Sequence, residues 1–151
     1  MLNNIVYNTR GYGIHTWHYA TQVTVSGNLV LNNGQGGILV GGSEVVMDGA
    51  VVTNNIVVDN RVGIREYGRT GQNTYQNNLL YDNTTNMMLL TSPDGGPTTT
   101  ANPLLVASGD VYRLESNSPA VDQGTERGAS KLDYDGQVRT APLDIGPFNL
   151  E

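Results

Sequence analysis

The sequence predicts an all-β solenoid, in which successive coils of the chain stack their strands into parallel sheets. A short pattern around an Asn recurs four times, at spacings of 24, 27 and 23 residues, which is typical of stacked repeats. Three short strand-like runs keep step with this pattern, and no segment of ten residues has a sustained helical period. We therefore expect about four regular coils in residues 1–91 and, in residues 92–151, an irregular coil and capping segment of the same domain.

The first strand of each coil follows the recurring Asn. Three apolar residues come directly after it in every copy, as in Asn4-Ile5-Val6-Tyr7. Because stacked coils lie about 4.8 Å apart, equivalent Asn side chains can hydrogen-bond along the stack, as in the Asn ladders of cross-β structures. The ladder is the preferred interpretation of this row, and a functional row of amides is the alternative. The four ladder positions are Asn4, Asn28, Asn55 and Asn78.

Two further strands complete each coil. The second begins eight or nine residues after the ladder Asn and reads Gly-Ile in the first three coils. The third precedes the next ladder Asn and is rich in Val and Thr, whose branched side chains favour strands. The predicted second strands are 13–16, 37–40, 63–66 and 86–89, and the predicted third strands are 23–25, 51–53 and 74–76.

The composition agrees with a coil of this kind. The chain contains 17 Asn and 19 Gly, the residues that best tolerate positive φ at tight corners. It has no Cys, which excludes a disulfide framework and thiolate metal ligands, and no apolar run approaches the ~18 residues of a membrane span. The net charge of −6, with a single Lys, argues against nucleic acid as the main partner.

The repeat resembles the right-handed parallel β-helix superfamily, the architecture of pectate lyases and related polysaccharide-active proteins. The resemblance covers roughly residues 3–90 and rests on the Asn-Asn-Ile-Val-x-Asn and Gly-Ile units. It implies a right-handed coil and an association with carbohydrate. It leaves the activity open, because function depends on sites added to a fold.

The C-terminal part has a different pattern, which resembles the last segment of many bacterial secreted β-helix proteins. This resemblance implies an extracellular or cell-surface location and a segment that closes the stack. We expect no Lys/Arg-led signal peptide at the start of this chain. Further strand-like runs occur at 103–106, 111–114 and 120–121. The resembling motifs are Asn102-Pro103, Tyr112-Arg113-Leu114, Ser118 to Gly124, Asp133 to Arg139 and Asp144 to Phe148.

The motif Asp133-x-Asp135-Gly136 admits two interpretations. The preferred one is a turn, in which Asp133 and Asp135 accept local backbone N–H groups and Arg139 pairs with a carboxylate. The alternative is a Ca²⁺ site, because hard cations bind clustered carboxylates, although the further ligands of an EF-hand loop are missing. We expect no other metal and no cofactor.

Two surfaces of the predicted solenoid need a cover. The first is the edge of the opening coil, because an unpaired sheet edge recruits further strands. No capping residues precede Asn3, so we expect a homodimer or a longer β-helix through this edge. The second is the outer face of the sheet that follows the ladder Asn, since its strands are apolar on both faces. Either the C-terminal segment or a second subunit covers this face.

The second strands carry the candidate site. If their Ile residues face inward, alternation along each strand places His15, Trp17, Arg65 and Tyr67 on one outer surface. Aromatic rings stack on the C–H faces of sugars, so Trp17 and Tyr67, with the imidazole of His18, are the predicted ligand-binding residues. The candidate catalytic pair is His15 as a base and Arg65 as the partner of a substrate carboxylate.

The spacing of this pair weakens the catalytic interpretation. His15 and Arg65 are two coils apart, roughly 9.6 Å, and Leu39 lies between them. Glu66 would face inward if the alternation continued, and it would then need a buried partner. We expect the strand to end at Arg65 and to leave Glu66 in solvent at a turn.

These features support two functions. The preferred one is a non-catalytic β-helix module that is associated with carbohydrate, either by binding it or as a structural part of a larger extracellular protein. The alternative is a polysaccharide lyase or glycoside hydrolase acting on an acidic polysaccharide. The first is preferred because four coils form a short groove and the sequence contains no complete catalytic set. Whether the chain is an enzyme is left open.

Overall fold

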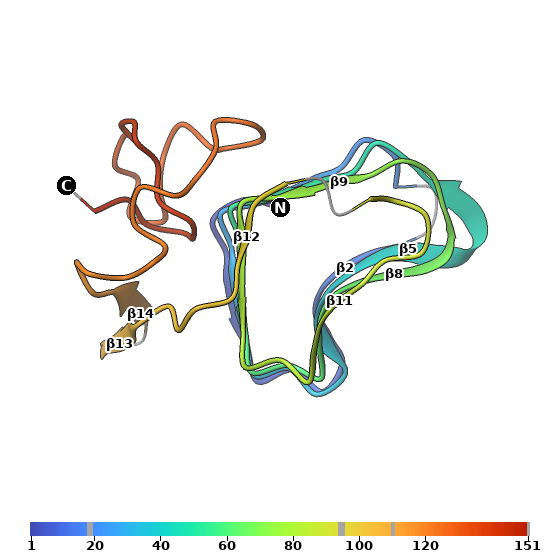
Figure 1. Cartoon of the computed structure of the whole chain (residues 1–151), viewed down its shortest axis with the longest axis horizontal. Coiled ribbons are helices and arrows are strands. Elements are labelled where there is room, and N and C mark those ends of the chain that lie inside the picture. The colour runs from blue at the N-terminus through green and yellow to red at the C-terminus, as the bar shows by residue number, and fades with distance from the viewer. Residues whose placement is uncertain (18–19, 94–95, 110, 151) are drawn as a thin grey trace.

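Four coils stack along one axis in the computed structural model (Figure 1), which describes residues 1–17, 20–93, 96–109 and 111–150, apart from the side chains of 43–45 and 69–70. The first three coils contribute one strand to each of three parallel sheets. The described residues form no helix, and hence none that could cross a membrane. The predicted all-β solenoid is confirmed.

The strands keep the predicted order. The five-stranded sheet contains β1 (Ile5–Tyr7), β4 (Leu29–Leu31), β7 (Ile56–Val58), β10 (Asn78–Tyr81) and β12 (Thr98–Thr99). The four-stranded sheet contains β2 (Tyr12–Thr16), β5 (Gly36–Met47), β8 (Val62–Thr70) and β11 (Thr85–Met88). The three-stranded sheet contains β3 (Thr24–Ser26), β6 (Val51–Thr53) and β9 (Thr74–Gln76), and β13 (Leu105–Ser108) pairs antiparallel with β14 (Val111–Leu114).

The Asn ladder is confirmed, and its hydrogen bonds all run in one direction. The Nδ2 of each ladder residue donates to the Oδ1 of the next, at 2.9 Å from Asn4 to Asn28, 2.8 Å from Asn28 to Asn55 and 2.9 Å from Asn55 to Asn78. Each accepting Oδ1 also takes the backbone N–H of the preceding ladder residue. Because three of the four side chains are fully buried, the row is structural.

A second ladder stabilises the other end of the same sheet. Asn33 donates to Asn60 and Asn60 donates to Asn83, each over 3.1 Å, and the backbone N–H of Thr9 donates to Asn33 in the first coil. These positions lie five residues after a ladder Asn in every coil. That constant offset is the sequence signal that could have identified the second ladder.

The Asn and Gly residues occupy the expected corners. Two positions in each coil have φ between 49° and 66°. One is the residue before the ladder Asn, and the other is the residue after the strand that follows this Asn. This left-handed conformation costs Gly nothing and Asn or Asp little. The eight residues are Asn3, Asn8, Gly27, Asn32, Asn54, Asp59, Asn77 and Asp82.

The central strands of the five-stranded sheet, β4, β7 and β10, are buried on both faces, as their sequence predicts. Val30, Val57 and Leu80 fill the inside of the coils. Leu29, Ile56 and Leu79 face the other way and form a second apolar cluster with residues of the C-terminal segment. The C-terminal segment, and not a second subunit, therefore covers this outer face.

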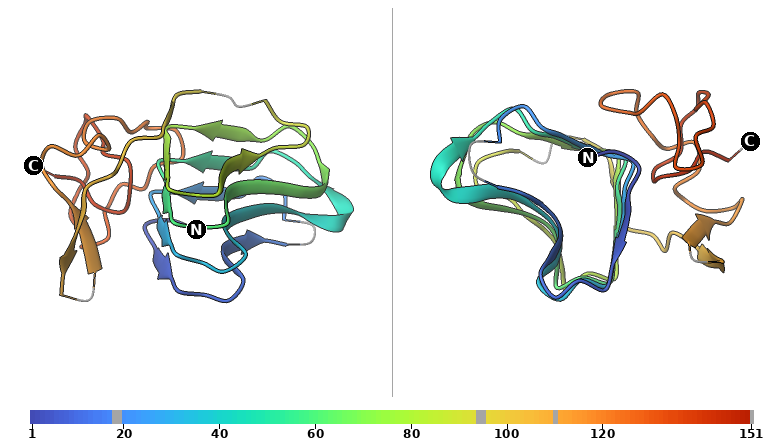
Figure 2. Two further views of the ribbon diagram at one scale, coloured as in Figure 1. Left: turned by 60° about the horizontal axis from the view of Figure 1, so that its bottom comes forward. Right: turned by 180° about the vertical axis from the view of Figure 1, so that it is seen from behind.

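This placement differs from the expected cap. The C-terminal segment lies beside the stack rather than over one of its ends (Figures 1 and 2). Leu114, Ala120 and Ile145 are the buried apolar residues of this segment that pack against the sheet, and burying them offsets the ordering of an irregular chain. The outer edges of β1 and β2 have no neighbouring strand among the described residues, and association through this edge stays a prediction.

The C-terminal motifs form turns that fix this segment. Arg139 was expected to pair with a carboxylate, and this is wrong, because its guanidinium donates to the backbone carbonyls of Gly146, at 2.6 Å, and Phe148, at 3.3 Å. The predicted strand at 120–121 is also wrong. Residues 118–121 form a turn, in which the N–H of Val121 donates to the carbonyl of Ser118.

One coil is longer than its neighbours, and β5 accommodates the difference. The pairing of β5 with β8 shifts between Gly42, opposite Gly68, and Met47, opposite Thr70. Met47 is five residues after Gly42, whereas Thr70 is only two residues after Gly68. Strand β5 therefore contains three more residues than β8 in this stretch. The spacing of 27 residues in this coil exceeds the spacing of 23 in the coil of β8 by four. The fourth extra residue lies before the paired strands, because Ile38 is ten residues after Asn28 whereas Ile64, its partner, is nine after Asn55.

Candidate functional site

The outer face of the four-stranded sheet contains two adjoining hollows. We call the first the aromatic hollow. It has a volume of about 510 Å³ and is lined by Gly11, Tyr12, His15, Trp17, Gln35, Leu39, Arg65 and Tyr67. We call the second the arginine hollow. It has a volume of about 550 Å³ and is lined by Tyr12, Gln35, Arg61, Val62, Arg65, Thr84, Thr85 and Met88.

The predicted outward positions do face this surface. Ile14, Ile38 and Ile64 are aligned across β2, β5 and β8 and are buried. His15 is exposed, and Trp17 and Tyr67 are each 42% exposed. Four of the five candidate residues therefore line one hollow. The fifth, His18, lies outside the described residues.

Three rings form a row along β2. The ring centroids of His15 and Trp17 are 4.6 Å apart, in an edge-to-face arrangement at 78°. The ring of Tyr12 lies 6.1 Å from that of His15. Edge-to-face contacts of this kind fix the orientation of aromatic side chains, so the floor of the aromatic hollow holds rings in defined positions.

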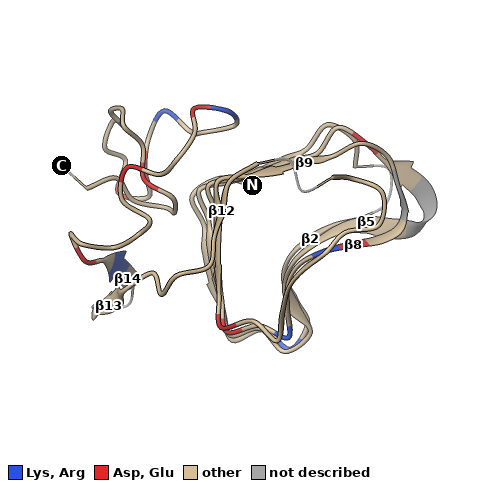
Figure 3. Cartoon of the chain, viewed as in Figure 1, with Lys and Arg blue, Asp and Glu red and all other residues tan. Residues whose placement is uncertain are grey.

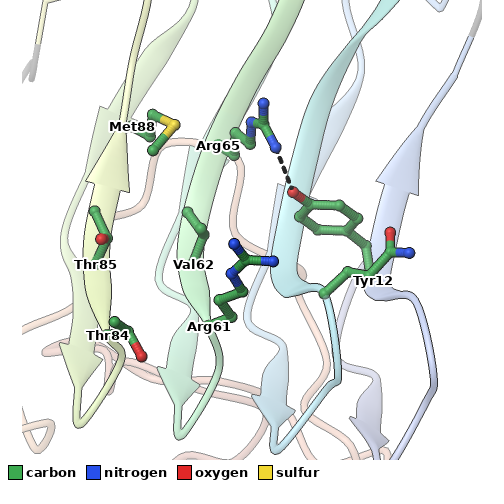
Figure 4. Close-up of a pocket in the computed structure, with 8 residues that line it drawn as sticks. Tyr12, Arg61, Val62, Arg65, Thr84, Thr85 and Met88 are labelled. Carbon is green, nitrogen blue, oxygen red and sulfur yellow. Dashed lines mark hydrogen bonds between the residues drawn. The ribbon is translucent and has the colours of Figure 1, made fainter.

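Arg65 connects β8 to β2. Its guanidinium crosses β5 and donates from Nη1 to the Tyr12 hydroxyl at 3.2 Å (Figure 4), and its Cζ lies 5.2 Å from the centroid of the Tyr67 ring. The Arg65 side chain thus closes the gap of two coils that separates it from the row of rings. Leu39 lies beneath this arm, 5% exposed.

Tyr12 is a site residue that the sequence did not reveal. Strict alternation counted back from Ile14 would turn Tyr12 inward. Gly13 breaks the alternation, because a Cβ at Gly13 would meet the Val30 Cγ1 at 2.5 Å inside the coil. Gly37 repeats this geometry against Val57, at 2.3 Å. Gly13 and Ile14 therefore both face the inside of the coil, and Tyr12 faces outward. The recurring Gly before Ile is the sequence signal for this pair of inward positions.

Glu66 is buried, and the expectation that it lies in solvent is wrong. Strand β8 continues to Thr70, so the alternation carries Glu66 inward, where it is 1% exposed. Oε1 accepts hydrogen bonds from Asn73 at 3.1 Å and the Tyr75 hydroxyl at 2.9 Å. Oε2 accepts the backbone N–H groups of Leu90 at 2.8 Å, Thr91 at 3.1 Å and Ser92 at 3.4 Å.

The hydrogen bonds decide the charge of this carboxylate. Burial alone would raise the pKa of Glu66, but hydrogen bonds from Ser92, Thr91, Leu90 and Asn73 lower it more, and the pKa falls to about 2. Burial and the adjacent Glu66 charge raise the pKa of Tyr75. Glu66 is thus a structural anion inside the coil and takes no part in either hollow.

The charges on the outer face are positive. Arg61 and Arg65 line the arginine hollow, and no acidic residue lines either hollow. Within the described part of the chain the one ion pair is Arg113 with Asp135, at 2.8 Å in the C-terminal segment. That segment lies across the molecule from β8 (Figure 3).

The Asp133 motif is used for chain contacts. Oδ1 of Asp133 accepts the N–H groups of Asp135 and Gln137, each at 2.9 Å, and Asp135 pairs with Arg113. No group of three or more His, Asp or Glu side chains that could hold a metal ion occurs among the residues described. Asp133 thus forms the predicted turn, whereas Asp135 differs from the prediction because its carboxylate pairs with the Arg113 side chain.

A family model described as the right-handed β-helix region matches residues 1–92. The chain belongs to this family. The match covers all four coils of the β-helix and ends where the C-terminal segment starts. No curated protein and no solved structure matches the chain. Family membership establishes the β-helix and leaves its ligand to be argued from the outer face.

Proposed function

We propose that this β-helix is a carbohydrate-binding module and that the aromatic hollow is its binding surface. The observation that carries the proposal is the pair of exposed rings, Trp17 after β2 and Tyr67 on β8, with β5 between them. Strand β5 presents Gly41 opposite Tyr67, so no side chain separates the two rings at this level. Ligand sites of proteins combine such apolar surface with a few fixed polar groups, here Tyr12 and His15.

The single Trp of the chain makes the proposal testable, because Trp17 is the only source of tryptophan fluorescence. A panel of neutral and acidic oligosaccharides would be titrated against the protein while its emission is followed. We expect the emission to shift with at least one class. A panel that leaves the emission and the heat of mixing unchanged would contradict the proposal.

A matched pair of variants locates the binding surface. Tyr67→Ala removes a ring of the hollow, and Tyr134→Ala removes a ring of similar exposure, 45%, in the C-terminal segment. We expect Tyr67→Ala to weaken binding about tenfold, since a buried aromatic contact contributes more than 1 kcal/mol. Tyr134→Ala should bind like the unaltered protein. Equal affinities for the two variants would place the ligand elsewhere.

The alternative function, cleavage of an acidic polysaccharide by a lyase reaction, is favoured by one observation. Arg65 bonds to Tyr12, and this brings a cation, a phenol and the imidazole of His15 to one hollow. In such a reaction a base removes the proton α to a uronate carboxylate while a cation binds that carboxylate. The C–O bond at the β carbon then breaks, and the leaving oxygen takes a proton.

Absorbance near 235 nm distinguishes the two functions, because elimination creates an unsaturated uronate. We expect no increase when the protein is incubated with uronate polysaccharides. An increase that His15→Ala abolishes would replace the binding proposal with the lyase reaction.

A further inference from the structure

The arginine hollow adjoins the aromatic hollow but differs from it in chemistry. Its lining contains two guanidinium groups and two Thr hydroxyls, whereas the aromatic hollow contains the rings. Figure 4 shows Arg65 on β8 and Arg61 directly before this strand, between Tyr12 and the Thr pair. The two hollows share Tyr12, Gln35 and Arg65 as a common wall.

The two arginines have no carboxylate partner among the described side chains. Neither forms an ion pair in the part of the chain that the structure describes, although the protein carries a net charge of −6. Arg65 donates one N–H to the Tyr12 hydroxyl, and its Nε is buried without a hydrogen-bond partner. Guanidinium groups are strong donors to carboxylate and sulfate oxygens, so this pair is suited to an anionic group of a ligand.

The geometry sets a minimum length for that ligand. Arg61 and Tyr67 are six residues apart, which corresponds to about 20 Å along a strand. A ligand that contacts both Arg61 and Tyr67 is therefore an oligosaccharide and not a single sugar. Arg65 belongs to both linings, which makes the path between them continuous.

We infer that the ligand is an acidic oligosaccharide of mixed character, with an anionic sugar against Arg61 and Arg65 and an uncharged sugar against Trp17 and Tyr67. The inference rests on the proposed carbohydrate-binding function and adds to it the order of the two sugars. The anionic group is a carboxylate or a sulfate, since both present oxygens that a guanidinium binds.

Three hexasaccharides with the same backbone test the inference. The first alternates a uronate with N-acetylhexosamine, the second is the same compound with its carboxyl groups reduced to alcohols, and the third is the reduced compound with sulfate on the hexosamine. We expect the first or the third to bind at least tenfold more tightly than the second in calorimetry. The preferred compound identifies the anion. Binding should weaken as salt rises, because salt screens exposed charges.

Two variants assign the anion to its residues. Arg61→Gln removes an exposed charge that forms no ion pair with the described residues, so the fold should be unaffected. Lys131→Gln removes an equal charge from the C-terminal segment. We expect Arg61→Gln to weaken binding of the acidic compound about tenfold and to leave binding of the reduced compound unchanged. Lys131→Gln should change neither.

The outcomes separate this inference from the function on which it rests. Equal affinity for acidic and reduced compounds, or an acidic preference that survives Arg61→Gln, would overturn the inference and leave carbohydrate binding intact. If none of the three compounds and no member of the wider panel alters Trp17 emission or produces heat, both fail.

Discussion

Glu66 gives the sharpest test of how the coils are held together. The carboxylate is 1% exposed and accepts three consecutive backbone N–H groups of residues 90–92 together with donors from Asn73 and Tyr75. Replacing it by Gln removes the charge and puts an amide N–H₂ where an acceptor is needed. A donor then faces a donor, and buried groups lose their partners.

The pKa sets the magnitude of the effect. A carboxyl whose pKa falls from 4.5 to about 2 on folding contributes about 3 kcal/mol to the free energy of unfolding at pH 7. This contribution is fully present above pH 4.5 and is lost as the pH falls toward 2, so about 1 kcal/mol remains at pH 3. We expect Glu66→Gln to cost at least about 3 kcal/mol at pH 7 and about 2 kcal/mol less at pH 3, because acidification reduces the charge contribution but not the cost of the unpaired donors.

Urea unfolding at the two pH values measures this difference. Glu115→Gln is the matched control, because Glu115 is exposed and its replacement should stay within about 0.5 kcal/mol. The reasoning is refuted if Glu66→Gln unfolds like the Glu115→Gln control at pH 7. It is also refuted if the gap between Glu66→Gln and the unaltered protein does not narrow on acidification.

Three further results are expected from the described contacts. Asn55→Ala removes hydrogen bonds to both neighbouring coils and leaves Asn28 without its acceptor, so urea unfolding should show a loss of at least about 3 kcal/mol; the exposed Asn117→Ala should show almost none. Gly41→Ala places a Cβ 2.1 Å from the Tyr67 carbonyl at a φ of 131°, and we expect a lower unfolding midpoint and weaker oligosaccharide binding in calorimetry. Ile145→Ala opens a cavity between the C-terminal segment and the sheet, which should cost about 2–5 kcal/mol and increase the binding of a hydrophobic dye.

The repeat made much of this structure predictable. Aligning the coils by their Asn was sufficient to place the ladder and to orient His15, Trp17, Arg65 and Tyr67, because stacked strands repeat the same geometry. The same alignment has an Asn five residues later in three of the four coils, so the second ladder could also have been predicted from the sequence.

The errors arose where contacts are non-local. The groups that donate hydrogen bonds to Glu66 come from Asn73, just before β9, from Tyr75 on β9 and from the segment after β11, and the sequence around Glu66 does not indicate them. Tyr12 was missed because alternation was assumed to continue through Gly13. Apolar residues on both faces of the five-stranded sheet showed that a cover was needed, but the choice between the C-terminal segment and a second subunit depends on the path of the chain after Thr91.

The shift within β5 shows where this chain tolerates a change of length. Three extra residues are absorbed between Gly42 and Met47, while the ladder bonds on either side keep the same lengths as in the shorter coils. An insertion at that corner leaves every later coil in phase, whereas a single residue added between the two ladders would displace one row of amides from the other. Evolution or design can therefore change the length of the chain between Gly42 and Met47 without rebuilding the stack.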